Sequence, residues 1–143
     1  MLIEVKAKVT KLTDGKYKKF NRTYLMEREF FSEAEYTVTQ MIEEEQVYDF
    51  EITSLRLSNI KEICEETLDP RKSTYIATLK ATYIMDDGSE KAMRYKTLLW
   101  AENLTDANRV AQQLFRQGYD MLIEGIKQVD YIYVTEQQQE NNE

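Results

Sequence analysis

The sequence lacks histidine altogether and contains one cysteine, one proline and four glycines in 143 residues. Without histidine the chain has neither the commonest general base nor the commonest transition-metal ligand, and Ser-His or Cys-His catalytic pairs are excluded. A metal site would need oxygen ligands, yet the acidic residues show no calcium-loop spacing and no distinctive carboxylate pair. We therefore expect a protein that is not an enzyme, with no catalytic residue, no metal site and no cofactor.

The single cysteine, Cys64, cannot form an internal disulfide, which fits a reducing cytoplasm. Its acidic neighbours Glu62, Glu65 and Glu66 disfavour the thiolate, so no reactive role is expected. Long apolar runs are also missing: none approaches the roughly 18 residues of a membrane-spanning helix. The N-terminal residues read as a strand rather than a signal peptide. These absences predict a cytoplasmic protein without a membrane partner.

What the chain does contain is an internal repeat. When the sequence is shifted by 73 positions, residues 14–42 align with residues 87–115 without a gap, and seven of the 29 pairs are identical. Ordinary composition would give about two identities. The shared positions include Gly15 with Gly88 and Ala34 with Ala107. The chain is therefore interpreted as two copies of one supersecondary unit.

Each copy has the pattern β-β-α-β, with alternating apolar residues in the strands and an apolar stripe along the helix. In the first copy the expected strands are 2–12, 17–29 and 48–57, the last extending toward 63. In the second copy they are 75–85, 92–101 and 121–134. Leu79-Lys80-Ala81 resembles Val5-Lys6-Ala7, which places Lys80 at the position of Lys6.

Capping signals mark where the two helices begin. Ser32 with Glu35 forms the pattern of a capping box, and Thr105 is the corresponding cap of the second helix. Gly118 is suited to end the second helix.

The predicted fold class is α+β, with a duplicated β-β-α-β unit forming a pseudo-twofold, mostly antiparallel sheet that carries two helices on one face. We expect a single compact domain over residues 1–134, with repeats 2–63 and 75–134 joined by a linker at 64–74. Residues 135–143 are rich in Gln, Asn and Glu and are expected to be disordered.

Charge is distributed unevenly along the chain. The net charge is −7, yet residues 6–22 hold seven basic residues and one acidic residue. In this segment cations alternate with aromatic rings, a mixture that binds single-stranded nucleic acid through phosphates and stacked bases. The second copy retains part of this mixture of cations and aromatic rings, at residues 91–96. The candidate nucleic-acid-binding residues are Lys6, Lys8, Lys16, Tyr17, Lys18, Lys19, Phe20, Arg22, Lys91, Arg94, Tyr95 and Lys96.

Two other interpretations remain open. The lysines also suit a solvated edge hairpin that resists aggregation, with Tyr17 or Phe20 turned inward. The acidic tail has the position of the partner-recruiting tails of single-strand-binding proteins, but it also suits an inert solubilising end. Protein partners at a sheet edge or at the tail, and a homo-oligomer, are therefore kept as alternatives.

The chain also resembles an uncharacterised family, the domain of unknown function 4494, of Bacteroides-type bacteria and their phages. The likeness rests on Glu4-Val5-Lys6-Ala7-Lys8-Val9, on Phe31-Ser32-Glu33-Ala34-Glu35 and on Phe50-Glu51-Ile52-Thr53-Ser54-Leu55. Lys80-Ala81-Thr82-Tyr83 and Thr105-Asp106-Ala107 also fit. The resemblance implies no activity and no catalytic residues. Occurrence in phages implies a replication accessory or, alternatively, a phage structural or accessory protein in a bacterial or phage-infected cell. A replication accessory agrees with the binding of single-stranded DNA that the basic segment predicts.

Overall fold

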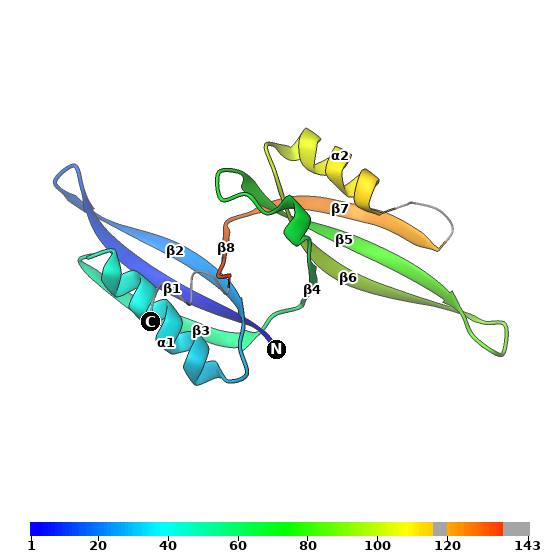
Figure 1. Cartoon of the computed structure of the whole chain (residues 1–143), viewed down its shortest axis with the longest axis horizontal. Coiled ribbons are helices and arrows are strands. Elements are labelled where there is room, and N and C mark those ends of the chain that lie inside the picture. Colours follow the sequence, from blue (N-terminus) through cyan, green and yellow to red (C-terminus); the bar gives the residue numbers. More distant parts are fainter. Residues whose placement is uncertain (116–119, 136–143) are drawn as a thin grey trace. The chain divides into compact units, whose positions relative to one another are not determined.

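A computed structural model describes residues 1–115 and 120–135. The described chain contains two α-helices, one short 3₁₀ helix (Glu65–Thr67) and eight strands arranged in two four-stranded sheets, which confirms the α+β class and the duplicated unit (Figure 1). The elements of the first half are β1 (Leu2–Thr13), β2 (Lys16–Glu27), α1 (Phe31–Glu44), β3 (Asp49–Leu57) and β4 (Ile60–Ile63). Those of the second half are β5 (Ser73–Ile84), β6 (Glu90–Ala101), α2 (Leu104–Leu114), β7 (Met121–Val129) and β8 (Tyr131–Tyr133).

The chain divides into two compact units, each with its own sheet, helix and core. Among the described residues, unit 1 comprises Met1–Ser58 and residues 130–135, and unit 2 lies within Asn59–Val129. The single continuous sheet predicted from the sequence is therefore wrong, because the eight strands form two separate sheets.

Unit 1 has the strand order β3-β1-β2-β8, with β8 parallel to β2 and the other neighbours antiparallel. Helix α1 covers one face of this sheet (Figure 1). Its buried stripe packs on the alternate residues of β1 that point toward it, as the sequence periodicities predict. The core consists of Ile3, Val5, Ala7, Val9, Tyr24, Met26, Ala34, Val38, Ile42 and Val134.

Unit 2 repeats this plan with the order β4-β6-β5-β7 and with β4 parallel to β6. The shorter helix α2 presents only small buried residues, Ala107 and Ala111, to the sheet. The core of this unit consists of Cys64, Tyr75, Ala77, Leu99, Ala101, Ala107 and Ala111.

Each repeat sends its last short strand to the sheet formed by the other repeat. The strands expected to run on to 63 and to 134 are both interrupted, at 58–59 and at Asp130, and the residues after each break enter the other unit. The backbone N–H of Cys64 donates to the carbonyl of Leu98 at 2.8 Å, and that of Val134 donates to the carbonyl of Leu25 at 2.8 Å. Cys64 and Val134 therefore end the two exchanged strands in the same way, each with a buried side chain.

The hairpin loops differ by one residue between the units. In unit 1, Asp14 and Gly15 form a two-residue loop with φ of 53° and 76°. In unit 2 the loop is longer: the N–H of Gly88, which has φ of 84°, donates to the carbonyl of Met85 at 2.9 Å. The added residue shifts the alignment of the first strands, so the predicted match of Lys80 with Lys6 is wrong.

Both predicted helix caps are also wrong. Helix α1 is preceded by Phe30, whose side chain makes no capping hydrogen bond, and Ser32 lies within the first turn. Helix α2 is capped by Asn103, whose Oδ1 accepts from the backbone N–H of Asp106 at 2.8 Å. Asparagine is at least as good a cap as threonine, and Asn103, two residues before Thr105, has the extended backbone that an N-cap residue adopts. Gly118 and the expected disordered tail from 136 onward lie outside the described residues.

Candidate nucleic-acid interface

The unit 1 sheet has one face under α1 and one face turned away from it, which we call the open face of unit 1. Because side chains alternate along a strand, Ile3, Val5, Ala7 and Val9 point toward the helix, while Lys6 and Lys8 lie on the open face. The antiparallel register places Asn21 opposite Lys8 and Lys19 opposite Thr10 on that same face. Alternate residues of the two strands of the predicted basic hairpin therefore lie together on one face of the sheet.

Three lysines of the open face are exposed and carry no ion pair with any residue in the described ranges: Lys6, Lys8 and Lys19. Tyr17, opposite Leu12 in the same register, shares this face, and 60% of its surface is exposed. Its ring centroid lies 4.4 Å from that of Tyr48, with the ring planes tilted by 42°. This surface combines unpaired cations with an accessible aromatic ring, and the β1–β3 register also places two carboxylates on it, Glu51 opposite Lys8 and Asp49 opposite Thr10.

The other half of the hairpin points to the α1 side of the sheet. Lys16, Lys18, Phe20 and Arg22 pair in register with Thr13, Lys11, Val9 and Ala7. Phe20 is 42% exposed, so neither predicted aromatic is buried, but Tyr17 and Phe20 do not form one platform. Strand alternation therefore separates residues that the sequence analysis had grouped together.

Arg22 is engaged by the end of α1. Its Nη1 and Nη2 atoms donate to Oε1 and Oε2 of Glu45 at 2.8 and 3.0 Å, and Nη1 also donates to the hydroxyl of Tyr24 at 3.1 Å. The guanidinium of Arg22 lowers the pKa of the Glu45 carboxyl, and the carboxylate raises the pKa of Arg22. The guanidinium would have to give up this pair to bind a phosphate, so Arg22 is best described as a structural residue.

At the end of the open face where β8 pairs, an ion pair joins a buried carboxylate to a half-exposed guanidinium. Glu4 is almost fully buried and forms an ion pair with Nε of Arg56, which lies opposite it on β3. Tyr131 and Tyr133 occupy the same end of this face, opposite Thr23 and Leu25. Burial, followed by the negative charge of Glu4, raises the pKa of the Tyr131 hydroxyl. These tyrosines are not among the site residues predicted from the sequence, although their alternation around Ile132 is a signal that the sequence contains.

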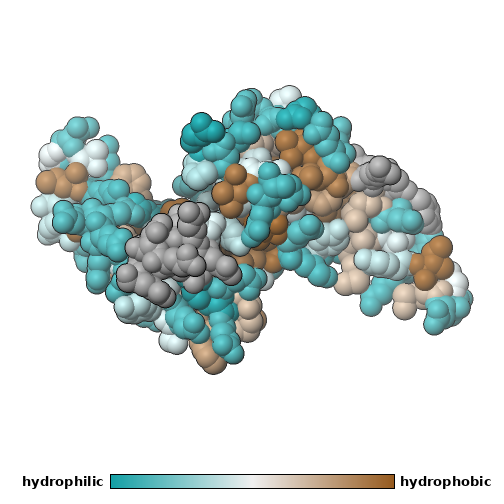
Figure 2. Space-filling model, in the orientation of Figure 1, coloured by the Kyte–Doolittle hydropathy of each residue, from teal (hydrophilic) through white to brown (hydrophobic). Residues whose placement is uncertain are grey.

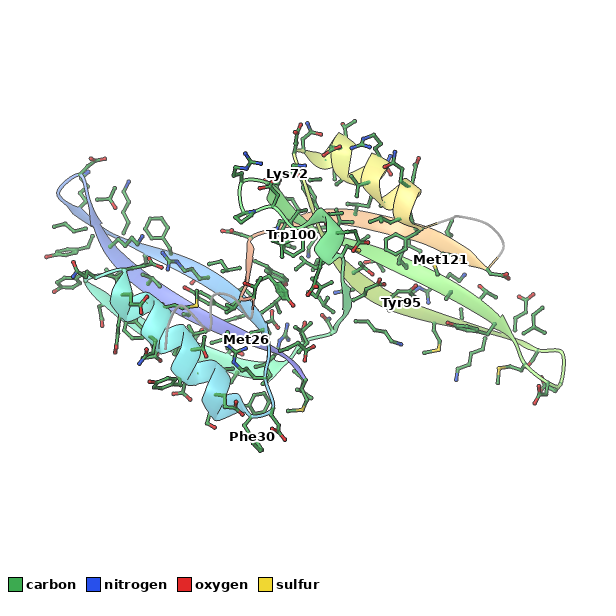
Figure 3. All side chains as sticks on the ribbon, in the orientation of Figure 1. Met26, Phe30, Lys72, Tyr95, Trp100 and Met121 are labelled. Atoms are coloured by element: carbon green, nitrogen blue, oxygen red, sulfur yellow. The ribbon has the colours of Figure 1, made fainter. Side chains whose placement is uncertain are left out.

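In unit 2 the predicted residues also divide between two faces. Arg94 and Lys96 lie on the face turned away from α2, the open face of unit 2, where Nε of Arg94 donates to Oε1 of Glu124 at 2.6 Å. Lys91 and Tyr95 lie on the α2 side. The hydroxyl of Tyr95 is 3.7 Å from the sulfur of Met121 (Figure 3), and Nζ of Lys61 is 5.8 Å from its ring centroid. Tyr95 is therefore held within unit 2 and is not placed to stack on a base beside Arg94.

Cys64 is 2% exposed and packs in the core of unit 2. Burial, with smaller contributions from Glu62 and Glu66, raises the pKa of its thiol to about 12. Within residues 1–115 and 120–135, no three acidic or cysteine side chains gather into a group that could hold a metal ion. Among the same residues, no helix is long and apolar enough to cross a membrane.

The fold and the two open faces define an α+β protein built from a duplicated β-β-α-β unit, with hydrophilic side chains over much of the visible surface (Figure 2). Within this class, the chain belongs to the family described as Domain of unknown function (DUF4494), whose model matches residues 1–138. No curated protein and no solved structure matches the chain.

Proposed function

We propose that this protein is a non-enzymatic single-stranded nucleic-acid-binding protein that makes its contacts through the open face of unit 1. The observation that carries the proposal is the group of three exposed, unpaired lysines on that face: Lys6, Lys8 and Lys19. Each lysine can neutralise a phosphate and release counterions, which is the main source of affinity for nucleic acids. The hydroxyls and amide beside them, from Thr10, Asn21 and Thr23, can add hydrogen bonds to the backbone.

The exposed ring of Tyr17 favours a single strand over a duplex. Bases can stack on an aromatic side chain only when they are unpaired, and such stacking tolerates any sequence. A lysine-bearing sheet face with an aromatic residue is the type of surface that many single-strand binders use. Because the whole chain carries a net charge of −7, binding must depend on this local patch and should weaken steeply with salt. We place this activity in the cytoplasm of a bacterial or phage-infected cell, in replication.

Fluorescence anisotropy with labelled oligothymidine tests the proposal. If three lysines contact phosphates, log K should fall with log salt with a slope of about −2, because each phosphate of a single strand contributes about −0.7. Lys6→Glu with Lys8→Glu should weaken binding at least tenfold. The matched control is Lys16→Glu with Lys18→Glu, which makes the same charge change on the α1 side of the sheet. Absence of binding at low salt, or an equal loss in both double variants, would overturn the proposal.

A protein partner at a sheet edge is the second candidate, favoured by one depression in unit 2. The edge strand β7 and helix α2 line a shallow depression of about 440 Å³, formed by Leu104, Thr105, Asn108, Ile123, Glu124, Gly125 and Ile126. An extended peptide that adds to β7 would place apolar side chains there. Size-exclusion chromatography with light scattering tests a second copy as the partner, and a strict monomer that binds oligothymidine would favour the first function.

A further inference from the structure

Four cations project from the open face of unit 2, and only two of them were predicted from the sequence. Arg94 and Lys96 lie on β6, Lys80 lies opposite Arg94 on β5, and Lys127 lies opposite Ile76 on β7. Two acidic residues share this face: Glu124, whose carboxylate pairs with Arg94, and Glu90, which lies opposite Ile84 toward the hairpin loop. Lys80, Lys96 and Lys127 have no ion pair with any residue that the structure describes. Three strands therefore bring cations that are distant in sequence onto one surface.

The register shows which positions of the two open faces correspond. A bulge follows Lys6 in the pairing of β1 with β3, and the equivalent bulge follows Thr78 in the pairing of β5 with β7, so Lys6 corresponds to Thr78. The exchanged strands give an independent match, because Thr23 pairs with the first residue of β8 and Lys96 with the first residue of β4. Thr23 therefore corresponds to Lys96.

At this matched pair the lysine lies on the first strand of the hairpin in unit 1 and on the second strand in unit 2, and the threonine lies opposite it in each unit. Unit 1 has Lys6 opposite Thr23, whereas unit 2 has Thr78 opposite Lys96. Directly opposed residues in an antiparallel pair have Cβ atoms about 5 Å apart, so the long lysine side chain reaches nearly the same space from either strand. Both units therefore keep one cation and one hydroxyl at this position, although the sequence repeat shows no identity there.

The next pair along the hairpin strengthens the match. Lys8 lies opposite Asn21 in unit 1, and Lys80 lies opposite Arg94 in unit 2. Gly125 pairs with Thr78 beside these cations, and a Cβ added at Gly125 would meet no atom within 4 Å. The backbone beside Thr78 and Lys96 is therefore open to a ligand.

We propose that the open face of unit 2 is a second binding site for the phosphodiester backbone of single-stranded nucleic acid, so that each chain holds two sites. The proposal takes its ligand class from the proposed function of unit 1, but it rests on different residues. Two linked sites make the second contact intramolecular, which raises the affinity for a strand long enough to reach both.

Gly125 provides the sharpest variant, because a side chain fits there without a clash. Gly125→Glu places a carboxylate among Lys80, Lys96 and Arg94, and Gly125→Gln adds a neutral side chain of the same shape as the control. Native mass spectrometry at low ionic strength with an oligothymidine of about 6 nucleotides, within the range of known site sizes, counts the strands bound. We expect two strands per chain for the native protein and for Gly125→Gln, and one for Gly125→Glu and for Lys80→Glu with Lys127→Glu.

The outcomes separate the two proposals. If the native chain binds one strand, and Lys6→Glu with Lys8→Glu abolishes binding while Gly125→Glu has no effect, the unit 2 site is refuted and the proposed function stands. If Gly125→Glu abolishes the binding of one strand and the Lys6/Lys8 variant has no effect, the unit 2 site stands and the function assigned to unit 1 falls. Absence of binding by the native chain at low salt would refute both.

Discussion

Arg22 and Glu45 form a two-pronged ion pair that connects β2 to the end of α1, with N–O distances of 2.8 and 3.0 Å. Lys11 adds a second cation, with Nζ 3.3 Å from Oε2 of Glu45. The pair offsets the unfavourable position of acidic residues at a helix C-terminus. An arginine that the sequence analysis assigned to nucleic acid therefore holds unit 1 together.

Glu45→Gln should lower the free energy of unfolding at pH 7 by about 0.5–1 kcal/mol, since the pair is partly exposed and screened by solvent. Because Arg22 lowers the pKa of Glu45, this stabilisation is present above the ordinary glutamate pKa of 4.5 and is lost as pH falls through the folded-state pKa. Urea unfolding at pH 7 and pH 3 measures both effects. Glu44→Gln, at an exposed neighbouring position, is the control. An unchanged free energy of unfolding at pH 7 in the Glu45 variant would contradict the structural role of Arg22.

Lys18 and Lys19 are neighbours in sequence that lie on opposite faces of the hairpin. Lys19→Glu should weaken oligothymidine binding about tenfold and reduce the steepness of the salt dependence by about 0.7, the contribution of one phosphate. Lys18→Glu makes the same charge change and should leave both quantities close to those of the native chain. Anisotropy titrations at three salt concentrations measure them. Equal losses in the two variants would show that the hairpin acts only through its net charge.

Cys64 should behave as a small apolar core residue. Because burial raises its pKa to about 12, the stabilisation from the protonated thiol is complete below the ordinary value of 9.0 and is lost as pH rises toward 12. Over that range the native chain should lose about 1.4 kcal/mol of unfolding free energy per pH unit relative to Cys64→Val. Urea unfolding of both proteins at pH 8, 9 and 10 measures the difference. Rapid reaction of the folded protein with a thiol reagent at pH 8 would contradict this role.

We expect Asn103, rather than Thr105, to be the N-cap residue that stabilises α2. Asn103→Ala removes the acceptor for the N–H of Asp106 and should cost about 1 kcal/mol of unfolding free energy. Thr105→Ala changes the residue that the sequence pattern had suggested and should cost less than about 0.5 kcal/mol, as for an ordinary exposed position. Thermal unfolding followed by circular dichroism compares the two. The opposite ranking would restore the sequence-based cap.

Val134 belongs to the second repeat by sequence but to the core of unit 1 by structure. Val134→Ala should therefore lower the stability of unit 1 by about 1–3 kcal/mol, the range expected for a buried valine. Amide hydrogen exchange should show faster exchange in β1 and β2 and little change in β5 and β6. Faster exchange confined to the strands of unit 2 would contradict the strand exchange.

Local patterns predicted the elements well. The alternation in 2–12 and the apolar stripe through Ala34, Val38 and Ile42 correspond to β1 and α1 because these features depend on residues close in sequence. The same alternation already placed Lys18 and Lys19 on opposite faces, although a run of charged residues suggested one patch. Both helix caps were misplaced by two residues: α1 begins after Phe30, which makes no side-chain cap, and Asn103 caps α2 in place of Thr105.

The sequence by itself determined the duplication, the α+β class, the order of the main strands and helices, and the period-two separation of side chains, all of which depend on short-range geometry. The tertiary structure alone decided where the short strands after Leu57 and Val129 pair. It also decided that Arg22 forms an ion pair with Glu45. On unit 2 it brought four cations onto one face: Lys80, Arg94, Lys96 and Lys127. These relationships join residues far apart in the chain. Sheet register sets them, and register depends on how whole strands bury their apolar faces.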